Sequence, residues 1–348
     1  MAYDEPWTLD ADDFPEDGPQ REQLRFALRY AVLAPSGHNT QPWTLVLSDS
    51  CVELRADRER ALPVVDPAGR ALLISCGAAL GHLTVALRAF HRAHIVETFP
   101  DPGDPDLLAR VLLTGEKLLP DAEARALLDA IPRRHSNRSA YEDRPAEPGD
   151  LMACVAAAEA EGALLHVLTE PGERDAVAAL IAEGDLAQMH DPAFRRELAH
   201  WVKSRHGADQ DGLSARTFGL PDALSAVGAL VIRFTDQGDS VAAKDRRLAQ
   251  DAPALAVLTT PADTPADWLA AGRALSRVLL TLTRAGLAAA FLNEPIEVPE
   301  LRPRLRGLLP RFNCTGDGVP QLLMRIGYPQ QSVPAAARRP LEDVLVER

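Results

Sequence analysis

The chain has 348 residues and a formal net charge of −13 at pH 7, with 46% hydrophobic and 25% charged residues. This composition is typical of a folded globular protein and excludes wholesale disorder. The length predicts about two domain-sized units. The acidic balance argues against a protein that coats nucleic acid or an anionic membrane.

The cysteines and the N-terminus predict a cytoplasmic protein. Cys51, Cys76, Cys154 and Cys314 lie far apart and form no CxxC pair, which is typical of reduced thiols. The first residues are acidic where a signal peptide would be basic. We expect no apolar run to approach the ~18 residues of a membrane span.

The N-terminal third predicts a helix, a polar loop and a hairpin before a long apolar helix. Residues 1–20 are acidic and contain three prolines, which predicts a mobile arm or a strap over the surface. Apolar spacing and turn residues then predict the following elements. They are a helix over 21–34 that Pro35 ends, a loop over 34–43, strands over 44–48 and 51–57, a helix over 70–90 and a strand over 94–99.

The rest of the chain repeats this alternation with one long interruption. Residues 171–215 are the least regular stretch and contain helical pieces. The other predicted elements are helices over 120–130, 148–161 and 266–285, an Arg-dense turn over 131–141, and strands over 163–168, 228–234, 254–260, 287–293 and 322–328.

Two long helices resemble each other at an offset of 195 residues. Gly77 then matches Gly272, and Leu80 matches Leu275. Because the order of neighbouring elements also matches, we predict an α+β fold of two related halves. Each half is expected to be a mostly antiparallel sheet packed by helices, with the two long helices at the shared interface. The predicted boundaries are an arm over 1–20, a first half over 21–130, and a second half over 131–348 with an insertion at about 170–245.

The densest group of chemically active side chains is the turn IPRRHSNR. It places Arg133, Arg134, His135, Ser136 and Arg138 within six residues. Guanidinium groups and helix-start N–H groups suit phosphate oxygens, so the turn is a candidate anion site. The alternative is a solvated basic turn that pairs with the acidic surface.

A second candidate is the loop PSGHNTQPW. Ser36, Asn39 and Gln41 could present amide and hydroxyl edges to a flat heterocycle held between prolines, such as Pro35, and Trp43. The alternative is a polar turn leading into a strand. A third candidate is NEPIE, residues 293–297, whose backbone could face a ligand or could simply begin a helix.

Other well-known site motifs are missing from the sequence. There is no GxGxxG after a strand, no GxxxxGK[ST] and no GxSxG, so the common nucleotide-binding and hydrolase motifs lack support. His190, His200 and His206 match no metal-ligand spacing, and we predict no metal site.

Taken together, these segments resemble the flavin-dependent nitroreductase family, in its double-length Acg-type FMN-binding branch from actinobacteria. The resemblance runs from about residue 21 to 343. APSGHNTQPW is similar to the APSxxNxQPW loop of the family, and RRHSNR to its phosphate-binding turn. EPIE is similar to the P-I-E segment beside the flavin ring, and RIGYP with Arg338-Arg339-Pro340 to the terminal arm.

In this family two identical subunits build each site, one giving the turn and the P-I-E segment and the other the loop. Here the first half has only the loop and the second half only the turn. The resemblance therefore implies one FMN site between the halves of a single chain, which mimics a dimer and is a monomer or weak homo-oligomer. By matching position it implies these FMN contacts: Arg134, His135, Ser136 and Arg138, with Arg338 or Arg339, at the phosphate; Pro35, Ser36, Asn39 and Gln41 at the ring or ribityl edge; Pro295, Ile296 and Glu297 along the ring.

The resemblance implies hydride transfer through FMN to a small organic substrate such as a quinone, a nitroaromatic or a biosynthetic intermediate, with NAD(P)H as a possible donor. The alternative is FMN storage beneath a closed lid with little turnover. No side chain is nominated as a general acid or base, since the cofactor carries the chemistry. Val298 replaces the glycine that usually follows P-I-E, and its side chain could crowd the approach to the ring or shift the backbone donor. The insertion, with Gly207, Gly212 and Gly219, is expected to form a lid; the alternative is a surface excursion.

Overall fold

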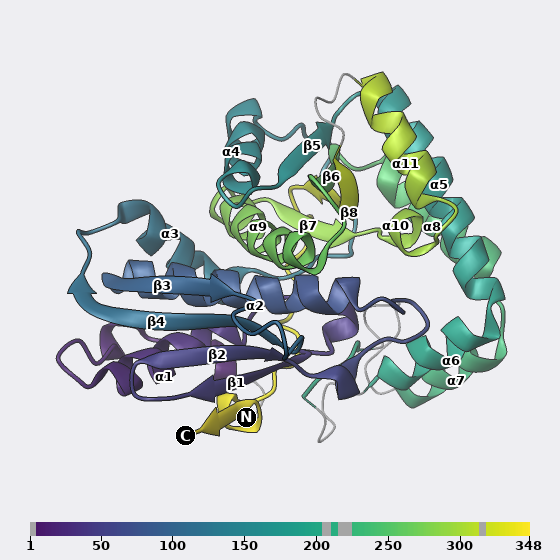
Figure 1. The fold of residues 1–348 in the computed structure, drawn as a ribbon. Coiled ribbons are helices and arrows are strands. Elements are labelled where there is room, and N and C mark those ends of the chain that lie inside the picture. Colours follow the sequence, from purple (N-terminus) through teal and green to yellow (C-terminus); the bar gives the residue numbers. More distant parts are fainter. Residues whose placement is uncertain (1–4, 204–209, 215–224, 313–317) are drawn as a thin grey trace.

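Two separate β-sheets organise the molecule, one built mainly by residues 43–117 and the other by residues 164–327 (Figure 1). The computed structural model describes residues 5–203, 210–214, 225–312 and 318–348. The expected α+β architecture, with mostly antiparallel sheets, is confirmed within those residues.

The first sheet has the strand order β3-β4-β2-β1-β9. Its strands are β1 (Trp43–Leu47), β2 (Cys51–Ala56), β3 (Arg92–Thr98), β4 (Leu107–Lys117) and β9 (Leu345–Glu347). The pairs are antiparallel except for β1 with β9, which is parallel. The last strand of the chain therefore completes the edge of the sheet built by the first third, as the yellow segment shows (Figure 1).

The second sheet has the strand order β5-β6-β8-β7, with every pair antiparallel. Its strands are β5 (Leu164–Leu168), β6 (Ala254–Thr260), β7 (Ala288–Phe291) and β8 (Val319–Gly327). All seven residues of β6 are buried, because helices cover both faces of this central strand.

Helices α2 (Arg70–Ala89) and α9 (Pro265–Arg284) cross at the centre of the molecule, between the two sheets (Figure 1). The crossing is so close that a Cβ on Gly77 would collide with the carbonyl oxygen of Leu269, and a Cβ on Gly272 with that of Ile74. The two contacts are reciprocal, since the offset of 195 converts one into the other. The expected packing of the two long helices against each other is confirmed.

Helix α2 also corrects one expectation. It is long and apolar enough to cross a membrane by length and composition, whereas we expected no such segment. In the structure 89% of its apolar window is buried inside the protein. Its hydrophobicity is thus accounted for by packing against α9 and the first sheet.

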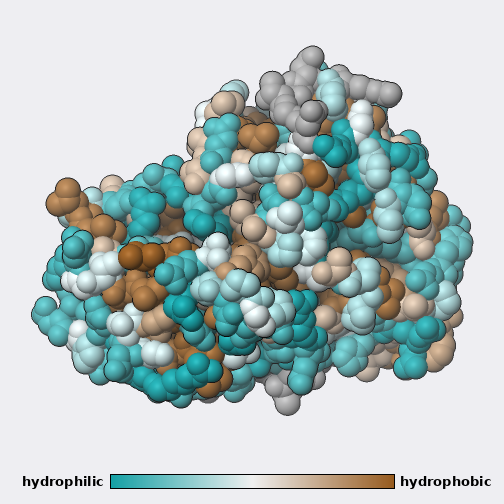
Figure 2. Space-filling view, in the orientation of Figure 1, coloured by the Kyte–Doolittle hydropathy of each residue, from teal (hydrophilic) through white to brown (hydrophobic). Residues whose placement is uncertain are grey.

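The remaining helices cover the sheets and form the insertion. They are α1 (Gln20–Ala31), α3 (Ala122–Ala130), α4 (Pro148–Glu159), α5 (Pro171–His190), α6 (Pro192–Trp201), α7 (Ser225–Phe234), α8 (Gly238–Gln250), α10 (Glu294–Glu297) and α11 (Arg302–Leu308). Helices α5 and α8 lie together beside the second sheet, while α6 and α7 extend away from it (Figure 1). In the space-filling view, hydrophobic residues form separate patches on a largely hydrophilic face (Figure 2).

Most predicted elements are present, but one was assigned the wrong type and several observed elements were not predicted. Residues 228–234, expected as a strand, lie in α7, because a short apolar run does not distinguish a strand from a half-buried helix. Strand β4 was not predicted, and neither was the polar helix α8. The predicted lid glycines Gly207 and Gly219 lie outside the described residues.

The described part of the N-terminal segment packs as a strap on the rest of the chain. Phe14 stacks on Phe90 of the first half, with ring centroids 4.1 Å apart. The indole nitrogen of Trp7 donates a hydrogen bond to the carbonyl oxygen of Ala336, 2.9 Å away. The strap thus reaches the C-terminal tail next to the candidate site.

Candidate functional site

Two adjoining cavities lie between the halves, with volumes of about 470 Å³ and 560 Å³. We call them the basic cavity and the apolar cavity, after the side chains that line them. They share Pro35, Ser36, Arg138, Lys244 and Phe291. The cavities are therefore two regions of one continuous site.

The loop before β1 supplies the wall from the first half. His38, Asn39 and Gln41 all have positive φ angles, of 48°, 56° and 52°. Such backbone is uncommon for residues other than glycine, and it is typical of functional sites whose surroundings hold the strain. The Ser36 hydroxyl accepts a hydrogen bond from the Gln41 amide at 2.9 Å and so closes the loop.

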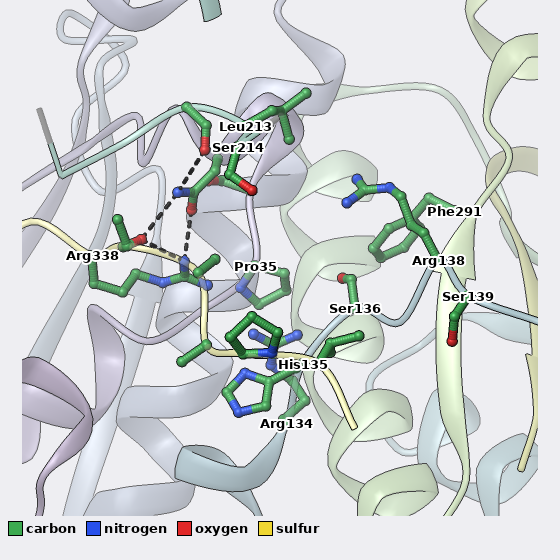
Figure 3. Close-up of a pocket in the computed structure, with 18 of the residues that line it drawn as sticks. Pro35, Arg134, His135, Ser136, Arg138, Ser139, Leu213, Ser214, Phe291 and Arg338 are labelled. Carbon is green, nitrogen blue, oxygen red and sulfur yellow. Dashed lines mark hydrogen bonds between the residues drawn. The ribbon is translucent and has the colours of Figure 1, made fainter. Parts of the chain in front are cut away.

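Asn39 links three segments of the chain at the rim of the basic cavity. Its side-chain nitrogen donates to the carbonyl oxygens of Gly212 and Ala337, at 3.1 Å and 3.0 Å. Its side-chain oxygen accepts a hydrogen bond from Arg338 at 2.7 Å. The dashed lines in Figure 3 show how this amide orients the Arg338 guanidinium toward the cavity.

The turn after α3 supplies the opposite wall. Ser136 pairs with Ala289 as a parallel bridge, and the amide of Asn137 donates to the Ala289 carbonyl at 3.1 Å. These bonds extend the edge of the second sheet beyond β7. As a result, Arg134, His135 and Ser136 line the basic cavity together with the tail residue Arg338 (Figure 3).

The basic cavity holds buried positive charge without a carboxylate partner among the described residues. Arg134 and Arg338 are each 4% exposed, and neither forms an ion pair there. The Nε atom of each arginine is buried without a hydrogen-bond partner. Burial lowers the pKa of Arg134 to about 10, and burial together with Arg134 lowers the pKa of Arg338 to about 9.

Arg138 lies where the two cavities meet, beside Phe291 (Figure 3). Desolvation lowers the pKa of its guanidinium, although the nearby Asp245 acts in the opposite direction. An uncompensated cluster of guanidinium groups in an enclosed space is costly. Its arrangement suits a dianionic ligand, because planar N–H donors match phosphate oxygens.

The structure brings eight of the thirteen predicted site residues to the wall of the basic cavity: Pro35, Ser36, Asn39, Arg134, His135, Ser136, Arg138 and Arg338. Glu297 lines the apolar cavity instead. The other four, Gln41, Pro295, Ile296 and Arg339, line neither cavity.

Gln41 and Arg339 act behind the wall rather than on it. Gln41 is fully buried, and its side-chain oxygen accepts a hydrogen bond from the backbone amide of Arg339 at 2.8 Å. The Arg339 side chain points away and donates to the Asp343 carbonyl. Of the two tail arginines left open by the sequence, the structure thus places Arg338 at the cavity.

The NEPIE segment forms α10, a single helical turn beneath the apolar cavity. Pro295 and Ile296 are buried, whereas Glu294 and Glu297 face the cavity. Val298 packs against the apolar core of the second half and lines neither cavity. The valine that replaces glycine at this position does not crowd the site.

Several cavity residues were not found from the sequence. Lys203, Lys244, Asp185 and Asp245 come from the insertion, where no motif identifies them. Trp7 of the strap lies edge-on to His135 at 4.9 Å, and the Arg338 guanidinium lies 5.0 Å from its ring centroid. Only the three-dimensional fold brings these side chains together.

Comparison with known proteins identifies the family, although no family model matches the chain. The Mycobacterium tuberculosis protein Rv3131, whose name classes it as an NAD(P)H nitroreductase, is 36% identical over 94% of this chain and 92% of its own length. The acg protein of the same organism, named in the same class, is 30% identical over 92% of this chain and 94% of its own length.

A similar solved structure is the FMN-dependent nitroreductase NfnB from Mycobacterium smegmatis in complex with NADPH. It has 15% sequence identity and a TM-score of 0.38, and the match covers 60% of this chain and 89% of that one. The sequence relatives, matched over nearly their full lengths, show that this chain belongs to the nitroreductase family.

Proposed function

We propose that this protein binds FMN across the two cavities and acts as an FMN-dependent oxidoreductase on a small organic substrate. The observation that carries the proposal is the pair of buried arginines, Arg134 and Arg338, which face the basic cavity without a counterion among the described residues. A phosphate group would supply that counterion.

The residues present fit FMN at both ends. Arg134, Arg138 and Arg338, with Ser136, would hold the phosphate in the basic cavity, where the buried Nε atoms of Arg134 and Arg338 are unsatisfied. The isoalloxazine ring would extend past Pro35 and Phe291 into the apolar cavity. Bound FMN would supply hydride-transfer chemistry, which belongs to the cofactor.

The chain's own residues shape the ring site and limit water access. Helix α6 is fastened over the apolar cavity, because Glu197 accepts hydrogen bonds from the backbone amides of Val64 and Val65 at 2.8 Å and 3.0 Å. Phe194 and Leu198 of the same helix pack with Leu62. We propose that α6 and α7 form the lid.

This fastening also favours a second candidate function, in which the protein stores or sequesters FMN with little turnover. A lid held by hydrogen bonds to the first half restricts entry of a second substrate. The names of the relatives favour the enzymatic function, since they class these proteins as NAD(P)H nitroreductases. The two functions differ in whether NADH or NADPH reduces the bound flavin.

We further propose that the two halves reproduce within one chain the paired arrangement of a homodimer. The reciprocal contacts of Gly77 with Leu269 and of Gly272 with Ile74 support this, because a twofold interface pairs each residue with its partner's equivalent. The site then needs no second chain, and a monomer or a weak homo-oligomer is expected.

The test begins with the purified protein. We expect it to be yellow and to release FMN on denaturation, and Arg134→Ala with Arg138→Ala to weaken FMN binding by ~1.5–3 kcal/mol per lost contact. A colourless protein that takes up no added FMN would refute both candidate functions. Anaerobic addition of NADPH or NADH then separates them: rapid bleaching supports the enzyme, and a flavin that stays oxidised supports storage.

A further inference from the structure

Three carboxyl groups meet in the wall of the apolar cavity, outside the predicted FMN contacts. Asp185 comes from α5, Asp245 from α8 and Glu294 from α10. One oxygen of each lies within 4.8 Å of the others. The close approach of α5 to α10 at Gly184, where a Cβ would lie 2.6 Å from that of Glu294, forces this proximity.

These carboxyl groups have no cationic partner within ion-pair distance among the described residues. Asp185 is 4% exposed, and its Oδ2 is buried without a hydrogen bond. The Oε2 atom of Glu294 is also buried and unpartnered. Since buried polar atoms are normally satisfied, these two oxygens indicate a missing positively charged or donating partner.

Charged groups from every neighbouring element face the cluster at longer range. Lys244, Arg138 and Arg325 all line the same cavity, and Arg325 also donates a hydrogen bond to the Ser139 carbonyl, 2.9 Å away. Glu297 adds a fourth carboxyl group on α10. Burial and repulsion by neighbouring carboxylates raise the pKa of Asp185 to about 8 and also raise the pKa of Glu294, while burial raises the pKa of Asp245 against the opposing effect of nearby cations. Asp185 therefore retains its proton at neutral pH.

Much of the rest of the cavity wall is hydrophobic, although Arg70, Gln188 and Gln237 also line it. Its wall includes Ile74, Met189, Phe194, Ile232 and Phe291. A metal ion would bring bound water into this apolar space, and Lys244 and Arg138 would repel a doubly charged ion more strongly than a single charge. An organic molecule with an apolar body and one ammonium group matches both the wall and the cluster.

We propose that the apolar cavity binds hydrophobic amines in their ammonium form, with Asp185, Asp245 and Glu294 as the counterion. The proposed oxidoreductase function adds one further step: hydrophobic amines are then the substrate class of the site. Only this assignment of the substrate class, and not the binding of amines, rests on the proposed function. Binding of the cation favours the ionised carboxylates, so protons leave the cluster when the ammonium group enters.

The experiment is isothermal titration of the FMN-loaded protein with 2-phenylethylamine, and with 2-phenylethanol as the uncharged analogue. We expect the amine to bind at least tenfold more tightly than the alcohol at pH 7. The binding enthalpy should depend on the ionisation enthalpy of the buffer in the sense of proton release. Asp185→Asn and Asp245→Asn should each weaken amine binding at least tenfold and leave alcohol binding unchanged.

The matched control is Glu183→Gln, because Glu183 lies on α5 two residues before Asp185 but pairs with Arg304 at 2.6 Å on the surface. It should bind the amine as the wild type does. Equal affinity for amine and alcohol, unchanged binding by both Asn variants, or tight binding of Mg²⁺ or Mn²⁺ instead of the amine would overturn the proposal. FMN content is measured separately by flavin absorbance, so a failure of FMN binding is distinguished from a failure of amine binding.

Discussion

Arg134 and Arg338 donate hydrogen bonds to the same acceptor, the carbonyl oxygen of Leu33, each at 3.4 Å. One arginine follows α3 and the other lies in the C-terminal tail, so a single backbone carbonyl holds two like charges against one cavity. Such an arrangement costs free energy through repulsion and desolvation. An anion bound between the guanidinium groups would offset that cost.

The tail provides a matched pair of variants to test this. Arg338→Ala should weaken FMN binding by ~1.5–3 kcal/mol, since it removes a charge-assisted contact in an enclosed site. Arg339→Ala should have little effect, because only the backbone amide of Arg339 bonds to Gln41 and its side chain points away. FMN fluorescence titration measures both. Equal losses in the two variants would contradict the assignment of Arg338.

The crossing of α2 and α9 predicts a second pair of effects. Gly77→Ala or Gly272→Ala forces a Cβ into the backbone of the facing helix, and overpacking of this kind costs about 1–3 kcal/mol or more. The two losses should be similar, because the contacts are reciprocal. Urea denaturation measures the free energy of unfolding.

The control for this pair is Gly307→Ala in α11, where no atom lies within 4 Å of the added Cβ. This variant should be neutral or slightly stabilising, by up to about 1 kcal/mol. Stabilities of Gly77→Ala and Gly272→Ala that match this control would disprove the tight crossing.

The sequence predicted the elements whose signals are local. The glycines and apolar spacing of residues 70–90 and 266–285 identified α2 and α9, and the adjacent apolar runs over 44–48 and 51–57 identified the β1–β2 hairpin. It missed β9, because three residues at the end of the chain form a strand only where β1 offers an open edge. Parallel pairing over such a distance leaves no local pattern.

In the candidate site, too, the sequence revealed residues that are contiguous and missed residues that only the fold brings together. The turn and the loop were found because their residues are contiguous, and the structure places most of them at one cavity. Asp185 and Asp245 were not found, because they are ordinary surface-type residues on α5 and α8 until those helices pack together. Gln41 was expected to contact the ligand, yet it holds the tail in place.

Asp185 also predicts a pH dependence of stability. Because burial raises its pKa to about 8, the folded state holds a proton that the unfolded state releases above pH 4. The contribution of Asp185 to the free energy of unfolding should therefore fall as pH rises from 4 to 8, by at most about 1.4 kcal/mol per pH unit for this one proton. Asp185→Asn should lack this decline.

Urea denaturation of both proteins at pH 5, 6, 7 and 8 checks the sign. The stability of Asp185→Asn relative to the wild type should increase with pH across this range. A difference that stays constant would show that Asp185 ionises normally in the folded protein.

His82 predicts the opposite pH dependence at the helix crossing. It is fully buried in α2, and its Nδ1 lies 2.8 Å from the Ser276 hydroxyl of α9. Burial, with the nearby Arg134 and Arg338, lowers its pKa well below 6.5. The unfolded state then binds a proton that the folded state does not, so this part of the stability is present above about pH 6.5 and is lost as pH falls below it.

The His82 contribution to the free energy of unfolding falls between pH 6.5 and pH 5 by at most about 1.4 kcal/mol per pH unit, the limit for one proton. His82→Gln should remove this decline. Ser276→Ala is the control, because it removes the hydrogen bond but keeps the imidazole, and its stability should still decline with acid. If His82→Gln declines as steeply as the wild type, the interface histidine does not titrate on unfolding. The acid sensitivity of the crossing would then have to come from other groups, such as His38, whose pKa burial lowers to about 4.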